Sequence, residues 1–215
     1  MKSLRKVCAL TACVVFVVGC AQKQKNLKTS LPPVNGKVLI ANVQINMNDI
    51  CPMCLRPVAS CVIEPYAAEG FATAVDTAFE VKRFDIIHGK LENQGTNFKE
   101  TIDHYLELAR RMNAKYMVLP VLNCWENRRG NAYSASQPAR VGFHLHIYDP
   151  QTGKEIWGGN FTEQQVSLTE NILDLADFAK RGGKWVPAEK LAQEGVEKLI
   201  QQFLEAKDNA PNPGH

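Results

Sequence analysis

The N-terminal stretch ending at Cys20 constrains the rest of the chain more than any other feature. Three basic residues, Lys2, Arg5 and Lys6, precede an uncharged and mostly apolar run over Val7–Val18. A short basic segment followed by an apolar segment is the layout of a secretory signal. The run is about a dozen residues long, which is too short for a membrane-spanning helix. The residues that follow are therefore expected to fold outside the cytoplasm.

The signal ends in a small residue and a cysteine, Gly19-Cys20, after two branched apolar residues, Val17 and Val18. This pattern resembles the lipobox of bacterial lipoproteins. The resemblance implies that residues 1–19 are removed, and that Cys20 then carries a diacylglycerol on its thiol and a third acyl chain on its amine. At roughly 0.8 kcal/mol per buried methylene, three chains make such an anchor effectively permanent. The alternative is an ordinary signal with a cysteine there by chance.

The residue after the lipidated cysteine bears on the membrane in which such a protein stays. Inner-membrane lipoproteins of enteric bacteria carry aspartate at that position, whereas this chain carries Ala21. The resemblance therefore implies an outer-membrane lipoprotein whose domain faces the periplasm.

The mature chain is electrically balanced, which limits the classes of partner it can have. Removing residues 1–19 removes three of the 25 basic residues and none of the 22 acidic ones, so the formal charge falls from +3 to zero. The remaining sequence has no basic block, which excludes an electrostatic nucleic-acid binder. It also has no second apolar run of spanning length, so the acyl chains are its expected contact with the membrane.

The hydrophobic pattern predicts a single α/β (α+β) domain over residues 37–206. A polar, proline-containing tether over residues 20–36 precedes it, and a disordered tail over 207–215 follows it. Two β-α-β crossovers, then a hairpin and C-terminal helices, predict a mixed sheet with helices packed on it. The pattern predicts strands at 38–45, 84–87, 116–125, 141–148 and 156–161, and helices beginning at Pro65, near Ile102, at Ser167 and at Pro187.

Particular residues refine this prediction. Pro120 cannot donate a ladder hydrogen bond, which puts it at a sheet edge or at a bulge. Asn113 can adopt the left-handed conformation that ends a helix. His144 and His146 alternate with apolar residues on one strand, which predicts a half-buried strand with both imidazoles toward solvent. A pair of metal ligands is the alternative for these two histidines.

Two segments connect the chain to a known group of proteins. Residues Ala109–Val118 form a helix, turn and strand pattern, and Tyr148–Trp157 form a strand, turn and strand that ends in tryptophan. Both resemble small periplasmic α/β domains: the N-terminal domain of the Tol-system propeller protein, the outer-membrane lipoproteins that activate penicillin-binding proteins, and the periplasmic part of the curli secretion lipoprotein. The resemblance implies a domain over residues 37–206 that binds other proteins and is not an enzyme. The chain departs from it in a cysteine-containing loop, 46–63, and in an insertion, 168–184.

Four cysteines remain if Cys20 is acylated: Cys51, Cys54, Cys61 and Cys124. An even number of thiols in an oxidising compartment makes all four candidates for disulfides. The same four could instead hold a zinc ion. Free thiols are a further alternative.

The residues that follow Cys54 disfavour three other functions of a Cys-x-x-Cys pair: haem attachment, a zinc knuckle and redox activity. A c-type haem site needs histidine where Leu55 stands, and zinc knuckles usually carry glycine at that position. A redox pair needs a helix after its first cysteine to lower the thiol pKa, and Arg56-Pro57 disfavours one.

No catalytic motif is present in the sequence. It contains no Gly-x-Ser-x-Gly and no phosphate-binding glycine loop, and Gly182-Gly183-Lys184 reads as a helix stop. We therefore expect a non-enzymatic, protein-binding accessory of an envelope assembly, serving peptidoglycan synthesis, secretion or transport, with no cofactor and no metal. The alternative is a periplasmic metal- or thiol-handling protein that uses Cys51, Cys54, Cys61 and Cys124.

Overall fold

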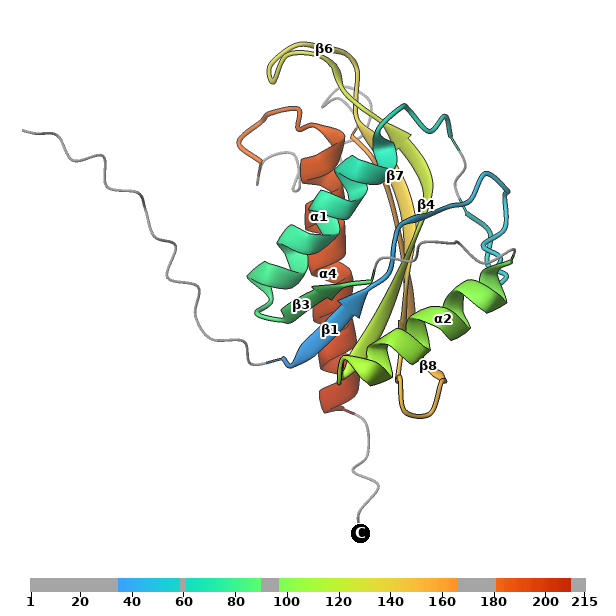
Figure 1. The fold of residues 1–215 in the computed structure, drawn as a ribbon. Helices are drawn as coiled ribbons and strands as arrows, with labels where there is room; N and C mark the ends of the chain where they lie inside the picture. Colours follow the sequence, from blue (N-terminus) through green and yellow to red (C-terminus); the bar gives the residue numbers. More distant parts are fainter. Residues whose placement is uncertain (1–34, 59–60, 90–96, 166–180, 210–215) are drawn as a thin grey trace, which may run out of the picture. The chain divides into compact units, whose positions relative to one another are not determined.

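The computed structural model describes residues 35–58, 61–89, 97–165 and 181–209 (Figure 1). The lipobox, most of the tether, the helix expected at Ser167 and residues 210–215 lie outside these ranges. Within the described ranges, every helix is too short or too polar to cross a membrane.

A mixed sheet forms the centre of the domain, as the sequence predicted, and it has six strands because the first predicted strand is divided in two. Five strands follow the order β3-β1-β4-β7-β8, and the short β2 also pairs with β4. The three early strands run parallel to their neighbours, whereas β4, β7 and β8 pair antiparallel. The strands are β1 (Lys37–Ile40), β2 (Gln44–Ile45), β3 (Asp85–His88), β4 (Tyr116–Glu126), β7 (Arg140–Tyr148) and β8 (Glu155–Gln164).

Helices cover both faces of this sheet (Figure 1). The helices α1 (Ala67–Val81) and α4 (Ala188–Asp208) pack on one face, and α2 (Phe98–Arg111) packs on the other. Because successive strand residues point to opposite faces, Val38 and Leu39 contribute to different hydrophobic clusters. The α1/α4 side holds the larger core.

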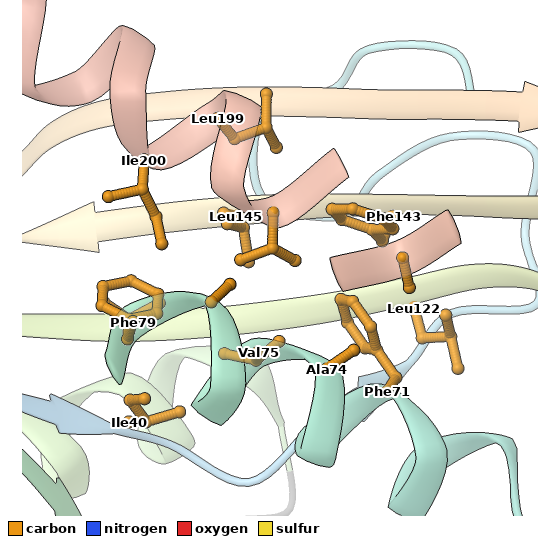
Figure 2. Close-up of a cluster of buried hydrophobic side chains, with 14 of the residues drawn as sticks. Ile40, Phe71, Ala74, Val75, Phe79, Leu122, Phe143, Leu145, Leu199 and Ile200 are labelled. Carbon is orange, nitrogen blue, oxygen red and sulfur yellow. The ribbon is translucent and has the colours of Figure 1, made fainter. Parts of the chain in front are cut away.

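Aromatic and branched side chains fill the core between α1, α4 and the sheet. Figure 2 shows Phe71, Val75 and Phe79 of α1 beside side chains of β7 and α4. The ring centroids of Phe71 and Phe143 lie 4.7 Å apart, and Phe71 is fully buried. The three- to four-residue spacing of apolar residues, read from the sequence, therefore identified the buried face of α1 correctly.

The first predicted strand, residues 38–45, is interrupted opposite Pro120. The pairing of β1 with β4 stops at Ile40 with Val118, and β2 resumes it at Gln44 with Val121. Pro120 lies in the interval and has no N–H to donate toward β1 and β2, so the ladder on that side is interrupted. On the other side of β4, Pro120 still pairs with Leu145 of β7. The expected irregularity is confirmed, but the edge position is wrong because β4 is central.

Further differences concern the ends of elements. The helix α1 begins at Ala67, two residues after Pro65, because Tyr66 has a left-handed backbone with φ 66°. The polar segment 126–138, between two predicted strands, is expected to be a loop but contains a small two-stranded sheet, β5 (Arg129–Gly130) with β6 (Ala135–Gln137). The helix α4 extends two residues into the predicted tail.

The strand β7 is buried on both faces, not half-buried as predicted. Its apolar residues face α1 and α4, and the opposite face carries His144 and His146, which are only 3% and 1% exposed. The solvent-facing interpretation of the two histidines is therefore wrong.

Candidate metal centre

Cys51 and Cys54 lie in a tight turn that follows β2. The N–H of Cys51 donates to the carbonyl of Arg56 at 2.9 Å, and the N–H of Leu55 donates to the carbonyl of Cys51 at 3.0 Å. Leu55 adopts a left-handed backbone with φ 55°, which glycine adopts more readily than other residues. The turn thus has the backbone for which zinc knuckles usually use glycine, although the residue is leucine.

Two histidines from a distant strand meet this turn. Nδ1 of His144 lies 3.4 Å from Sγ of Cys54, and Nε2 of His146 lies 3.4 Å from Sγ of Cys51. The four possible ligand atoms all lie within 4.8 Å of one another. Because residues i and i+2 of a strand share a face, the His-x-His spacing presents both imidazoles to the same turn.

The distances suit tetrahedral coordination by sulfur and nitrogen. With Zn–S near 2.3 Å and Zn–N near 2.0 Å, a tetrahedral angle places sulfur and nitrogen about 3.5 Å apart. The two observed S···N distances of 3.4 Å are close to this value. Small side-chain adjustments would therefore bring both cysteines and both histidines around one ion.

The surroundings of His144 favour the protonation state that metal binding needs. Burial, with the nearby charges of His146 and Arg56, lowers the pKa of His144 to about 4. The imidazole is therefore neutral at neutral pH, which is the form that coordinates a metal.

The first cysteine has opposing influences on its ionisation. Burial raises the pKa of the Cys51 thiol, while the backbone N–H groups of Cys54 and Met53 donate to its sulfur and act in the opposite direction. These two N–H groups would stabilise a thiolate, and a bound cation would favour that form more strongly still.

The four sequence-predicted cysteines are divided between two roles. Cys61 and Cys124 form a disulfide with an S–S distance of 1.96 Å, which joins the loop to β4. Cys51 and Cys54 carry free thiols. The set of four cysteines considered as a zinc site is therefore not assembled, because the disulfide uses two of its members.

The histidines are the part of the cluster that the sequence did not assign. They lie 90 and 95 residues from the cysteines they contact. The usable signal was the combination of Cys-x-x-Cys with His-x-His on one strand face. Each half is recognisable in the sequence, but nothing there shows that the two meet.

Fold and side-chain cluster together define an α+β domain with a buried set of two cysteines and two histidines. No protein-family model matches the chain, and no curated protein matches it in sequence. Among solved structures, the PelC dodecamer from Paraburkholderia phytofirmans is similar at a TM-score of 0.47 and 14% identity, over 80% of this chain and 88% of that one.

Two further solved structures are similar over most of their own length. Lipoprotein GNA1162 from Neisseria meningitidis gives a TM-score of 0.40 at 12% identity, over 69% of this chain and 99% of that one. The LpoB C-terminal domain from Salmonella enterica gives 0.34 at 15% identity, over 64% and 87%. At such identities, what this chain does has to be inferred from its own residues.

Proposed function

We propose that this chain is a non-enzymatic, lipid-anchored protein of the bacterial envelope that binds one transition-metal ion through Cys51, Cys54, His144 and His146. The observation that carries the proposal is the buried cluster of four ligand atoms within 4.8 Å of one another. Thiolate and imidazole donors in a tetrahedral set are typical of zinc. The lipid anchor on Cys20 and the location at the outer membrane are the sequence-based part of the proposal.

A site filled by four protein ligands has consequences for its role. Catalytic zinc sites keep a coordination position for water or substrate, whereas structural sites are closed by four protein ligands. This cluster supplies two sulfurs and two nitrogens, so the ion would hold the cysteine turn against β7. We therefore propose that the site is not catalytic. We also propose that it holds a metal, although the sequence predicted none.

Metal analysis of the mature protein, purified from membranes in mild detergent, tests the site. We expect one zinc ion per chain, and loss of that ion in Cys54→Ser and in His144→Ala. The double variant Cys61→Ser/Cys124→Ser is the matched control, because it removes two cysteines and keeps the cluster. Protein that binds no metal, or equal binding by all of these variants, would contradict the proposal.

Binding of an envelope protein partner is a second candidate function, favoured by a separate observation. Large apolar side chains are exposed along residues 45–66, and a concentration of such side chains marks interaction surfaces. The exposed side chains in this segment are Ile45, Met47, Ile50, Leu55, Val62 and Tyr66. The partner would belong to an assembly for peptidoglycan synthesis, secretion or transport.

Site-specific crosslinking in intact cells tests this second function. A photoreactive residue at Met47 or at Leu55 should capture the same envelope protein, because both side chains are exposed in one segment. A photoreactive residue at Glu107, exposed on α2, is the control and should not capture it. Different proteins at Met47 and Leu55, or equal capture at Glu107, would exclude a specific surface here.

A further inference from the structure

A carboxylate contacts the far side of one of the candidate metal ligands. Oε1 of Glu155 lies 2.9 Å from Nδ1 of His146, while Nε2 of the same ring faces the sulfur of Cys51. The His146 side chain is 1% exposed and that of Glu155 is 32% exposed. The contact therefore joins the buried cluster to the surface.

An irregularity in β8 places this carboxylate. His146 pairs with Gly158 and Ile147 pairs with Trp157, but Tyr148 then pairs with Glu155, so Ile156 is an extra residue. Without this bulge, Ile156 would stand opposite Tyr148, and Glu155 would point to the other face of the sheet. The bulge thus directs Glu155 to the face that carries His146, as bulges beside functional sites often do.

The glycine opposite His146 leaves room for the same contact. A Cβ atom at Gly158 would lie 2.5 Å from Oε1 of Glu155 and 3.6 Å from Nδ1 of His146. The first distance is a clash with the carboxylate, and the second is an ordinary contact with the ring. Any larger residue at position 158 would therefore displace Glu155 from His146.

We infer that Glu155 is a positioning residue of the metal centre, and that Gly158 provides the space for it. This inference rests on the proposed metal-binding function. The carboxylate accepts the Nδ1 hydrogen of His146, which fixes the tautomer that leaves the Nε2 lone pair directed at the ion. Such outer partners orient a ligand and raise its basicity, and losing one typically lowers metal affinity about 10- to 100-fold.

Zinc affinity of the mature protein, measured by competition with a chelating dye, tests the inference. Glu155→Ala should weaken binding about 10- to 100-fold at unchanged stoichiometry. Glu155→Gln should weaken it less, because the amide oxygen still accepts the hydrogen but carries no charge. Gly158→Ala should weaken it although the carboxylate remains in the chain.

Two controls separate positioning from general damage to the fold. Glu163→Gln removes another carboxylate of β8, one that pairs with Arg181, and should leave zinc affinity within about twofold. Gly158→Ala added to Glu155→Ala should cost nothing further, because the added Cβ no longer meets a carboxylate. The absorption of the Co(II)-substituted variants should keep its sulfur-to-cobalt bands, which shows that the cysteine thiolates still bind the ion.

The outcomes that overturn the inference are distinct from those that overturn the metal site. If the wild-type protein binds zinc and the Glu155→Ala and Gly158→Ala variants bind it with the same affinity, the metal site is supported and the role of Glu155 is excluded. An additive loss in the double variant also contradicts it, since the two residues would then act independently. Wild-type protein that binds no zinc overturns both proposals together.

Discussion

Nε2 of His146 lies 3.4 Å from Sγ of Cys51, across 95 residues of sequence. This contact and the Cys61–Cys124 disulfide hold the segment between β2 and α1 to two adjacent strands, β7 and β4. The described part of this segment contains only isolated bridges, such as that of Ile50 with Pro57. A second isolated bridge, that of Ile63 with Trp125, joins the segment to β4 through the backbone. The two side-chain links therefore supplement a sparse backbone pairing between this segment and the sheet.

Zinc should stabilise the folded domain. An ion that binds only the native state adds RT ln(1 + [L]/Kd), about 2.7 kcal/mol at a free concentration of 100 Kd. Calorimetry with and without zinc should show a higher Tm in its presence, and a chelator should reverse the shift. Cys54→Ser is the control and should show no zinc-dependent shift. An equal shift in that variant would place the stabilising ion elsewhere.

Loss of the disulfide should destabilise the domain without removing the metal. Cys61 and Cys124 are 63 residues apart, and the chain-entropy relation gives about 4 kcal/mol for closing a loop of that length. Denaturant unfolding of Cys61→Ser/Cys124→Ser should show a loss of this order, with one zinc ion still bound. Loss of zinc with the disulfide would mean that the cysteine turn depends on both cross-links.

The core on the α1/α4 side should be sensitive to truncation. Phe71 is fully buried against Phe143, and Phe71→Ala is expected to cost about 3–5 kcal/mol because it leaves a cavity. Denaturant unfolding measures this loss. Ile156→Ala is the control, since Ile156 is 46% exposed. Similar losses in the two variants would contradict the assignment of this core.

Local patterns in the sequence predicted most of the fold. Helix α2 shows this at its C-terminal end, where Asn113 is left-handed as predicted, whereas the helix begins at Phe98 after the capping residue Asn97 and not near Ile102. Each of these features depends on residues within a few positions of one another. The sheet interruption at Pro120 was predicted for the same reason.

The candidate site could be predicted only in part, because its formation depends on distant residues. The sequence marks Cys51 and Cys54 as a pair, but it does not show which other groups approach them. His144 and His146 were given a solvent-facing interpretation because alternation shows only that two faces differ. The cysteine turn covers the face of β7 that carries the two histidines, and only tertiary packing brings it there. The inferred role of Glu155 depends on a one-residue bulge at Ile156. The Gly158-Gly159 pair indicates that this strand can bend, but it does not place the extra residue.

The lipid anchor gives the last prediction. Acyl transfer in the lipoprotein class needs a thiol nucleophile, so Cys20→Ser should abolish acylation. The lipoprotein signal peptidase acts on the modified precursor, and so the variant should keep residues 1–19 and stay at the inner membrane. Incorporation of labelled fatty acid, with the gel mobility of precursor and mature forms, measures both effects.

The same variant separates anchoring from folding. The core of the domain is built from elements such as β1, α1 and β7, all of which lie beyond residue 36. Cys20→Ser should therefore still fold and still bind one zinc ion, which metal analysis of the purified precursor can check. Wild-type protein that takes up no labelled fatty acid, or Cys20→Ser that matures normally, would contradict the lipoprotein assignment. No residue of the proposed metal centre lies near position 20 in the sequence. Loss of zinc in the variant would therefore show that the metal centre depends indirectly on the anchor.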